Sequence, residues 1–386
     1  MKTILLYKWN EVNDAILERN LKALGYGVVP FDMQLNNYDM DGKFSLSLMT
    51  LIHKNKCDIC MSFNYIPLIS AICDVIGIPY VSWVYDSPNL TLFSKLIRQS
   101  CNYIFEFDKS SYQRLQERGV VHSYHMPLAV DTAYFDEQAK KPFGKKHEVC
   151  FLGSLYTNEH NYFDAITDWD STVYEVCQAA VAEQKFCYHE DRIRDMMTEE
   201  IISYLVEKAG LSLGGKYEET PLDLVAMMMH KKVTVEERRE LLIAVSEQFE
   251  TAIYTGSDTK NFPKLKNMGR ADYLTEMPQV FYNSKINLNI TLRSIESGIP
   301  LRALDVMACG GFLLSNYQPE LAEYFEDGKE LVLYHDLDDC LSKIAYYLEH
   351  EEERIQIAKA GQEKVREYFS YERKLKEIFA IVEGNL

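Results

Sequence analysis

Short apolar runs alternate with amphipathic stretches along most of this chain, and this alternation restricts the folds open to it more than any other feature. The apolar runs of the N-terminal third are residues 4–7, 28–31, 59–63, 80–85, 103–107 and 123–129. Several of the stretches between them end at a glycine, where a helix C-cap falls, as at Gly25, Gly77 and Gly119. This pattern predicts an α/β domain with a doubly wound parallel sheet.

A second α/β pattern follows a polar, lysine-containing linker. Its expected strands are residues 149–152, 252–254, 286–290, 312–314 and 331–334. From about 157 to 249 the period is helical throughout, which predicts an insertion of roughly three to five helices. We therefore expect an N-terminal domain over residues 1–138, a C-terminal domain over 146–370 that contains the insertion, and a C-terminal helix over 371–386.

The charge balance limits the class of partner. The 386 residues include 41 Lys and Arg against 58 Asp and Glu, a net charge of −17. Binding along nucleic acid needs a broad basic surface, so we expect no nucleic-acid partner. A small anionic ligand is compatible with this charge, because a few arginines and a helix N-terminus hold phosphate locally.

Three features bear on the cellular compartment. The chain begins with a strand pattern rather than a signal peptide. No window holds the roughly 20 apolar residues of a membrane helix, and the nine scattered cysteines fit reduced thiols. We expect a cytoplasmic protein without a transmembrane segment.

The strongest local motif lies between residues 292 and 315. Pro300 and Leu301 begin a predicted helix, because proline is favoured in the first helical turn. Arg293 and Arg302 flank this helix start, and two guanidinium groups next to a helix N-terminus form a clamp suited to a diphosphate. In the alternative interpretation, both arginines are surface groups paired with nearby carboxylates.

Three further carboxylate or loop positions are candidates for the same kind of site. Asp305 lies further along the predicted helix, where its carboxylate can accept hydrogen bonds from a ribose. Gly153 and Ser154 close the first strand of the second domain, where a glycine lets the backbone approach a phosphate. Alternatively, this Gly-Ser pair is an ordinary turn.

Candidate catalytic residues lie in the first domain. Asp86 follows a buried strand and is expected at the carboxyl edge of the sheet, where it could act as a general base for a hydroxyl group. The alternative is a helix cap for the segment that begins near Leu90. His122 and His125 lie on the last strand, and either could serve as the base or be a core histidine. We rank both below Asp86.

The chain resembles a known family at several of these positions. The segments that carry the resemblance are residues 282–291 (YNSKINLNIT), 298–312 (GIPLRALDVMACGGF), 151–156, 83–88 and 324–358. Together they resemble the CgeB-like branch of glycosyltransferases, the spore maturation protein type. The resemblance spans most of both α/β halves and leaves the helical insertion uncovered.

This resemblance implies a GT-B fold, in which two Rossmann-like domains face a cleft. It implies that the second domain binds a nucleotide-sugar donor, with Asp305 at the ribose and Gly153 and Ser154 at the donor phosphates, and that the first domain binds the acceptor. It also implies that no metal is needed, because basic side chains and a helix dipole stabilise the leaving diphosphate. Related retaining enzymes carry Glu-x7-Glu, but the nearest acid before Asp305 is Glu296, nine residues back. The stereochemical outcome is therefore not assigned.

We expect a bacterial, metal-independent glycosyltransferase of the hexosyl or N-acetylhexosaminyl type. It would move a sugar from a nucleoside diphosphate, with UDP as the nucleotide, to a hydroxyl of a protein or glycan acceptor, without a separate cofactor. Asp86 and His125 are the catalytic candidates. The insertion would shape the acceptor site or a homodimer contact. The alternatives are a nucleotide-sugar epimerase and a non-catalytic protein that binds a nucleotide sugar.

Overall fold

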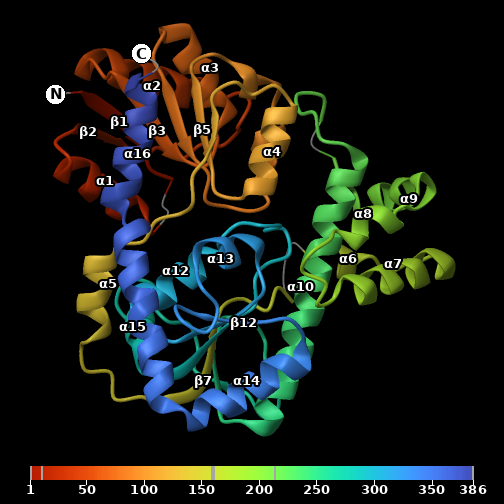
Figure 1. Cartoon of the computed structure of the whole chain (residues 1–386). Helices are drawn as coiled ribbons and strands as arrows, with labels where there is room; N and C mark the ends of the chain where they lie inside the picture. The colour runs from red at the N-terminus through yellow and green to blue at the C-terminus, as the bar shows by residue number, and fades with distance from the viewer. Residues whose placement is uncertain (1, 10–11, 158–160, 213, 385–386) are drawn as a thin grey trace. The chain divides into compact units, whose positions relative to one another are not determined.

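The computed structural model describes residues 2–9, 12–157, 161–212 and 214–384, which fold into two compact units (Figure 1). Unit 1 comprises Met1–Asp131, Gly214–Glu218 and Tyr368–Leu386. Unit 2 comprises Thr132–Leu213 and Glu219–Glu367. Among the residues described, no helix combines the length and apolar character that crossing a membrane requires.

Unit 1 is built on a six-stranded parallel sheet in the order β2-β1-β3-β4-β5-β6. Its strands are β1 (Thr3–Tyr7), β2 (Gly27–Phe31), β3 (Ile59–Phe63), β4 (Tyr80–Trp83), β5 (Asn102–Glu106) and β6 (Ser123–His125). The central strands are buried along their whole length, as expected for a parallel sheet with both faces covered. The apolar runs therefore predicted the strands of this unit correctly, although the last strand is shorter than expected.

Helices of unit 1 begin and end at residues suited to those positions. They are α1 (Asp14–Ala23), α2 (Gly42–Asn55), α3 (Pro67–Ile76), α4 (Lys109–Glu117) and α16 (Tyr371–Gly384), with two 3₁₀ helices, η1 (Leu90–Phe93) and η2 (Lys95–Arg98). Asp41 and Asp108 cap α2 and α4 with their side chains. Gly77 ends α3 with a φ of 81°, in the left-handed region. The C-terminal helix α16 packs against α1 within this unit.

Unit 2 contains the second six-stranded parallel sheet, in the order β12-β11-β10-β7-β8-β9. Its strands are β7 (His147–Leu152), β8 (Thr251–Tyr254), β9 (Lys266–Asn267), β10 (Ser284–Asn289), β11 (Leu313–Asn316) and β12 (Val332–Tyr334). The sequence did not reveal β9, which is only two residues long. The chain order reverses between β7 and β10, and such a switch point is where doubly wound sheets bind ligands.

The remaining helices of unit 2 cover this sheet or form the insertion. The covering helices are α5 (Thr132–Ala139), α11 (Met277–Tyr282), α12 (Leu301–Ala308), α13 (Pro319–Tyr324), α14 (Leu337–Glu349) and α15 (Glu351–Tyr368). The sequence analysis assigned α5 to the first domain. In the structure α5 packs against α11 and belongs to unit 2.

The insertion is helical in its described residues, as the period predicts. It consists of α6 (Tyr162–Ala165), α7 (Ser171–Gln184), α8 (Arg192–Met196), α9 (Glu199–Ala209) and the long α10 (Pro221–Gln248). The four shorter helices all pack against α10 (Figure 1). Met228 and Met229 of α10 are buried in a core shared with α7 and α9, so these methionines fill the core.

Candidate functional site

Two loops emerge side by side at the switch point of the unit 2 sheet. The strands β7 and β10 are neighbours, with Phe151 opposite Leu288. Gly153 and Ser154 follow β7, and the loop that leads to α12 follows β10. The backbone N–H of Thr291 in this loop donates to Oδ1 of Asn316, at the end of β11, over 2.8 Å. The carboxyl ends of three adjacent strands are therefore joined at the edge where a ligand is expected.

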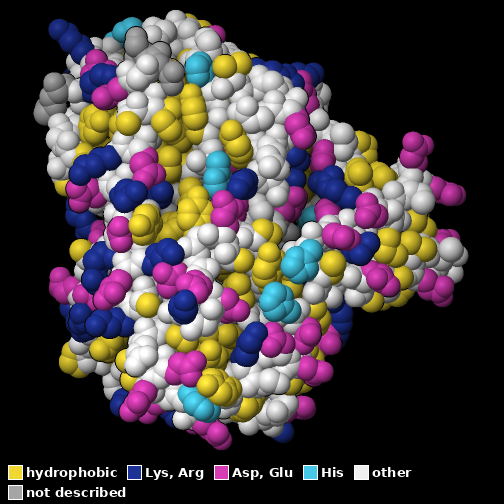
Figure 2. Space-filling view, in the orientation of Figure 1, with side chains coloured by type: hydrophobic (Ala, Val, Ile, Leu, Met, Phe, Trp, Pro, Cys, Tyr) yellow, Lys and Arg dark blue, Asp and Glu magenta, His cyan; other side chains and the backbone are white. Residues whose placement is uncertain are grey.

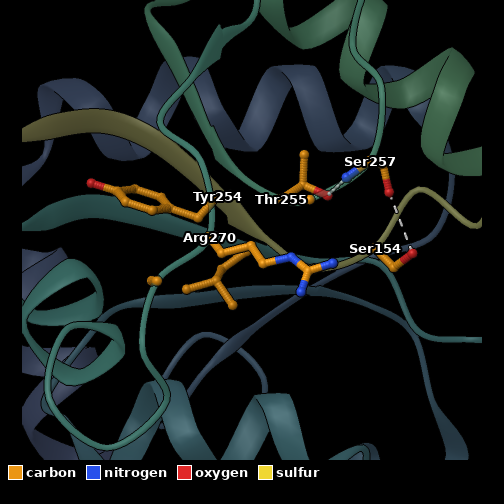
Figure 3. A pocket seen from close by; sticks show the side chains of 9 residues that line it. Ser154, Tyr254, Thr255, Ser257 and Arg270 are labelled. Carbon is orange, nitrogen blue, oxygen red and sulfur yellow. Dashed lines mark hydrogen bonds between the residues drawn. The ribbon is translucent and has the colours of Figure 1, made fainter.

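A pocket of about 280 Å³ opens at this edge (Figure 3). Its walls are formed by Leu152, Gly153, Ser154, Tyr254, Thr255, Gly256, Ser257, Arg270 and Ala271. Ser257 Oγ accepts from the Leu155 N–H over 3.0 Å, and Ser154 Oγ accepts from the Tyr156 N–H over 3.0 Å. The structure thus places Gly153 and Ser154 in a pocket, as their position after β7 suggested, and adds the loops after β8 and β9.

Arg270 supplies the positive charge of this pocket. Its side chain is exposed, and in Figure 3 the guanidinium points across the pocket toward Ser154 and Ser257. A Cβ on Gly256 would overlap this guanidinium. The Arg270 side chain can therefore occupy this position only because residue 256 is a glycine. Among the described residues no hydrogen bond or ion pair engages Arg270, which leaves its donors free for an anion.

A second arginine, Arg238, comes from α10 and lies at the switch point itself. Its guanidinium donates to the carbonyl of Ser154, after β7, and to the carbonyl of Ile290, after β10, the latter over 2.6 Å. It also lies over the ring of Tyr156, 4.8 Å from the centroid. Only 7% of the residue is exposed. Arg238 therefore fixes the two loops relative to each other.

Arg238 also leaves a positive charge beneath the pocket. Burial lowers the pKa of this guanidinium, but an arginine stays protonated at neutral pH. Within the described parts of the chain, no carboxylate lies within ion-pair distance of it, and its Nε has no hydrogen-bond partner. A buried charge without a counter-ion is costly even when carbonyls accept its hydrogen bonds, and an anion bound nearby would reduce that cost.

The α12 region differs from its expected arrangement in two ways. Pro300 is the N-cap, one position before the first helical residue Leu301. Arg302 forms an ion pair with Asp305 over 3.0 Å, which is the alternative that the sequence analysis left open. Oδ1 of Asp305 accepts from the Tyr273 hydroxyl, also over 3.0 Å.

Asp305 is consequently enclosed. It is 1% exposed, and burial raises its pKa to about 6, against the opposing effects of Arg302 and Tyr273. Both carboxylate oxygens have partners within the protein. Its expected contact with a ribose therefore stays a prediction, and that contact would require side chains that enclose Asp305 to move.

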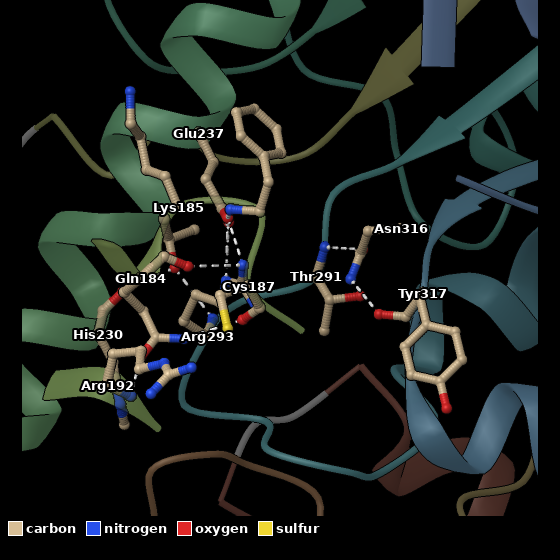
Figure 4. Close-up of polar contacts among 12 residues, drawn as sticks. Gln184, Lys185, Cys187, Arg192, His230, Glu237, Thr291, Arg293, Asn316 and Tyr317 are labelled. Atoms are coloured by element: carbon tan, nitrogen blue, oxygen red, sulfur yellow. Dashed lines mark hydrogen bonds and ion pairs between the residues drawn. The ribbon is translucent and has the colours of Figure 1, made fainter. Parts of the chain in front are cut away.

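Arg293 is placed differently from the expected clamp (Figure 4). It forms a buried ion pair with Glu237 of α10, and donates to the carbonyls of Gln184 and Cys187 over 3.2 and 3.1 Å. The guanidinium also stacks over Tyr188, 4.1 Å from the ring centroid. Groups of the insertion thus accept the hydrogen bonds of Arg293, because the insertion surrounds this loop. This contact joins segments that are distant in the sequence, so the spacing of residues in the motif does not reveal it. The structure gives no clamp of Arg293 with Arg302.

The catalytic candidates of unit 1 lie at the carboxyl ends of its strands. Asp86 follows β4, is exposed, and accepts from Asn64 Nδ2 over 2.6 Å. Asn89, not Asp86, caps η1, so the capping alternative is not observed. His125 ends β6, with its Nε2 3.3 Å from the carbonyl oxygen of Phe107. Catalysis by Asp86 or His125 stays a prediction.

Sequence reasoning missed one buried carboxyl group in the same unit. Glu106 ends β5 directly opposite His125 and is 2% exposed. Its Oε1 accepts from the Asp108 N–H over 3.2 Å, whereas Oε2 has no partner among the described residues. Burial raises the pKa of Glu106 well above its usual range. The sequence signal was only an acid at the end of an apolar run.

Fold and site together define a protein with two doubly wound α/β domains, the second of which has an arginine-bearing pocket at the carboxyl edge of its sheet. The model of the family described as "Glycosyl transferase-like" matches residues 236–380. This match covers the second sheet after β7 and begins just before Arg238. No curated protein gives a significant match.

Solved structures with the same architecture cover the whole chain. A glycosyltransferase from Rickettsia africae is 13% identical, with a TM-score of 0.57 over 98% of this chain and 97% of that chain. Sucrose-phosphate synthase from Thermosynechococcus elongatus is 10% identical, with a TM-score of 0.58 over 100% and 99%. Anabaena HepE in complex with UDP is 11% identical, with a TM-score of 0.56 over 100% of both chains. The chain has the GT-B fold, as the resemblance implied.

Proposed function

We propose that this protein is a glycosyltransferase that uses a nucleoside diphosphate sugar, with UDP as the nucleotide. The observation that carries the proposal is the pair Arg238 and Arg270 at the carboxyl edge of the second sheet, neither of which has an ion-pair partner among the described residues. The glycosyl transferase-like match and the GT-B fold support it. HepE, a neighbour of the same fold, was solved with UDP and with UDP-glucose.

The diphosphate would lie against the loop after β7. Arg270 and the Ser154 and Ser257 hydroxyls line the pocket and would contact the phosphate oxygens. Arg238 would add positive charge from beneath, and the N-terminus of α12 would add the partial charge of a helix dipole. Fixed donors aimed at developing negative charge are an effective way to stabilise a leaving group. This charge comes from the chain itself, so the mechanism we propose is metal-independent.

The transfer step would follow ordinary glycosyl chemistry. The oxygen of an acceptor hydroxyl forms a bond to the anomeric carbon of the donor sugar, and the bond from that carbon to the diphosphate oxygen breaks. The electron pair leaves with the nucleoside diphosphate, and the hydroxyl proton passes to a base. We propose Asp86 as this base, with His125 as the second candidate. The acceptor would be a hydroxyl of a protein or glycan in the cytoplasm. We also propose that the protein is a glycosyltransferase of the CgeB-like subtype.

Ligand-induced thermal stabilisation followed by a nucleotide-release assay tests this function. UDP and UDP-sugars should raise the melting temperature, because ligand that binds the folded state stabilises it. Arg270→Ala should abolish this shift. Lys260→Ala is a matched control, because Lys260 is a highly exposed cation in the β8–β9 connection and does not line the pocket. Stabilisation by NADH but not by UDP would refute the proposal. Conversion of the donor without UDP release would favour an epimerase.

A further inference from the structure

Three aromatic side chains from distant segments meet at the carboxyl edge of the unit 2 sheet. His189 comes from the turn between α7 and α8, Tyr317 follows β11, and His335 follows β12. The ring centroids of His189 and Tyr317 are 4.6 Å apart, and those of Tyr317 and His335 are 5.2 Å apart. Both histidines are exposed and Tyr317 is half-buried. We call these three residues the aromatic platform. Figure 2 shows histidine side chains (cyan) at the surface in the region where Figure 1 draws α10.

The turn that carries His189 is fixed by hydrogen bonds. Gln184 Nε2 donates to the carbonyls of Cys187 and Glu190, each over 2.9 Å. Gln184 Oε1 accepts from the Arg192 N–H over 2.7 Å. Arg293 binds the same turn from the loop after β10 (Figure 4). The insertion therefore presents His189 in a defined position.

The other side of the platform is joined to the loop after β10. Tyr317 N–H donates to the carbonyl of Tyr334 over 2.8 Å, and Asn316 Nδ2 donates to the carbonyl of Tyr317 over 2.9 Å. Asn316 also receives the hydrogen bond from Thr291 described above. The platform thus lies on the same sheet edge as the candidate site. Such preorganisation reduces the entropic cost of binding.

We propose that the aromatic platform is a subsite for a sugar ring of a neutral glycan acceptor, a proposal that rests on the proposed glycosyltransferase function. The C–H face of a pyranose can pack on aromatic rings, while imidazole nitrogens and a phenolic hydroxyl can bond its hydroxyl groups. Glu190, next to His189, forms an ion pair with Arg192 over 2.7 Å. Asp336, next to His335, accepts from the Asp339 N–H as the N-cap of α14. Because these charged groups already have partners within the protein, the surroundings of the platform favour a neutral saccharide over a charged ligand.

The test is saccharide binding by the full chain, measured by isothermal titration with neutral gluco-, malto- and chito-oligosaccharides. Tyr317→Ala and the double variant His189→Ala/His335→Ala should weaken binding at least tenfold while the affinity for UDP stays unchanged. The control is Tyr346→Ala/His350→Ala. This pair stacks at 3.7 Å on α14 and at its end, but it does not belong to the platform. The control should bind as the unaltered protein does.

A second measurement uses the unaltered protein, so it does not depend on whether a variant folds. Histidine ring resonances of His189 and His335 should shift in NMR spectra when the saccharide is added. The inference is overturned if no neutral saccharide binds, if the platform variants bind as well as the control, or if Zn²⁺ alone shifts these resonances and saccharides do not. If any of these results is obtained and the protein still binds UDP, the proposed function is not affected. If the unaltered protein does not bind UDP, the proposed function itself is contradicted.

Discussion

The ion pair between Arg293 and Glu237 gives the sharpest quantitative prediction. The side chains are 9% and 1% exposed, so both charges are removed from water. Glu237 also accepts from the Phe186 N–H over 2.8 Å. Arg293→Met keeps an unbranched side chain of similar length but leaves a buried carboxylate without its cation. Breaking a buried pair in this way costs about 3–5 kcal/mol.

Related variants separate charge from packing. Glu237→Gln keeps the shape of the side chain and leaves Arg293 its two carbonyl acceptors, so its cost should be lower, about 1.5–3 kcal/mol. The double variant should cost less than the sum of the two, because residues in contact couple. Lys208→Met is the control. It removes an ion pair with Asp168, which is 92% exposed at the surface of the same insertion, and should leave stability essentially unchanged.

Urea unfolding measures these free energies when it is followed by the fluorescence of Trp169, the tryptophan of unit 2, in a background in which Trp9 and Trp83 are replaced by phenylalanine. Hydrogen exchange reports the local effect, because the Phe186 amide binds Glu237 and the Arg192 amide binds Gln184. Both amides should exchange faster in Arg293→Met. A loss below about 1 kcal/mol with unchanged exchange in residues 184–192 would refute the inference that Arg293 holds this turn.

Three further predictions concern single side chains. Tyr273→Phe removes a hydrogen bond that lowers the pKa of Asp305, so this pKa should rise above about 6 in a carboxyl ¹³C NMR titration; an unchanged value would contradict the contact. The raised pKa of Glu106 means that the folded state holds a proton that the unfolded state loses, so stability should fall from pH 5 to pH 8. The free energy of unfolding in urea should fall less over this pH range in Glu106→Gln than in the unaltered protein. An equal fall in both would argue against the raised pKa of Glu106. Gly256→Ala should displace Arg270 and weaken UDP binding about tenfold by titration calorimetry, and unaltered binding would show that Arg270 does not contact the ligand.

The fold followed from the sequence because its determinants are local. Buried parallel strands are short and apolar, and helix ends carry capping residues or glycine, so β1 to β5 and the helix that ends at Gly77 were predicted close to their observed bounds. The exceptions are elements whose formation depends on neighbours. The strand β9 has two exposed residues and exists by pairing with β8. The helix α5 carries no sequence signal for the unit it joins, since that choice depends on its packing against α11.

The site was predictable only where it follows from strand ends. Gly153 and Ser154 lie in the pocket because they follow β7, and any residue after a parallel strand reaches that edge. Arg238 lies 84 residues beyond Ser154, yet it binds the Ser154 carbonyl. No spacing rule connects the two.

The position of Arg238 changes what the insertion is expected to do. The sequence analysis assigned the insertion to the acceptor site or a homodimer contact, because it is additional to the fold. In the structure its last helix supplies Arg238, which joins the loops after β7 and β10, and Glu237, which holds the loop containing Arg293. Removing the insertion would therefore separate the two loops that form the proposed diphosphate site. On these contacts, deletion of the insertion is expected to impair the proposed donor binding as well.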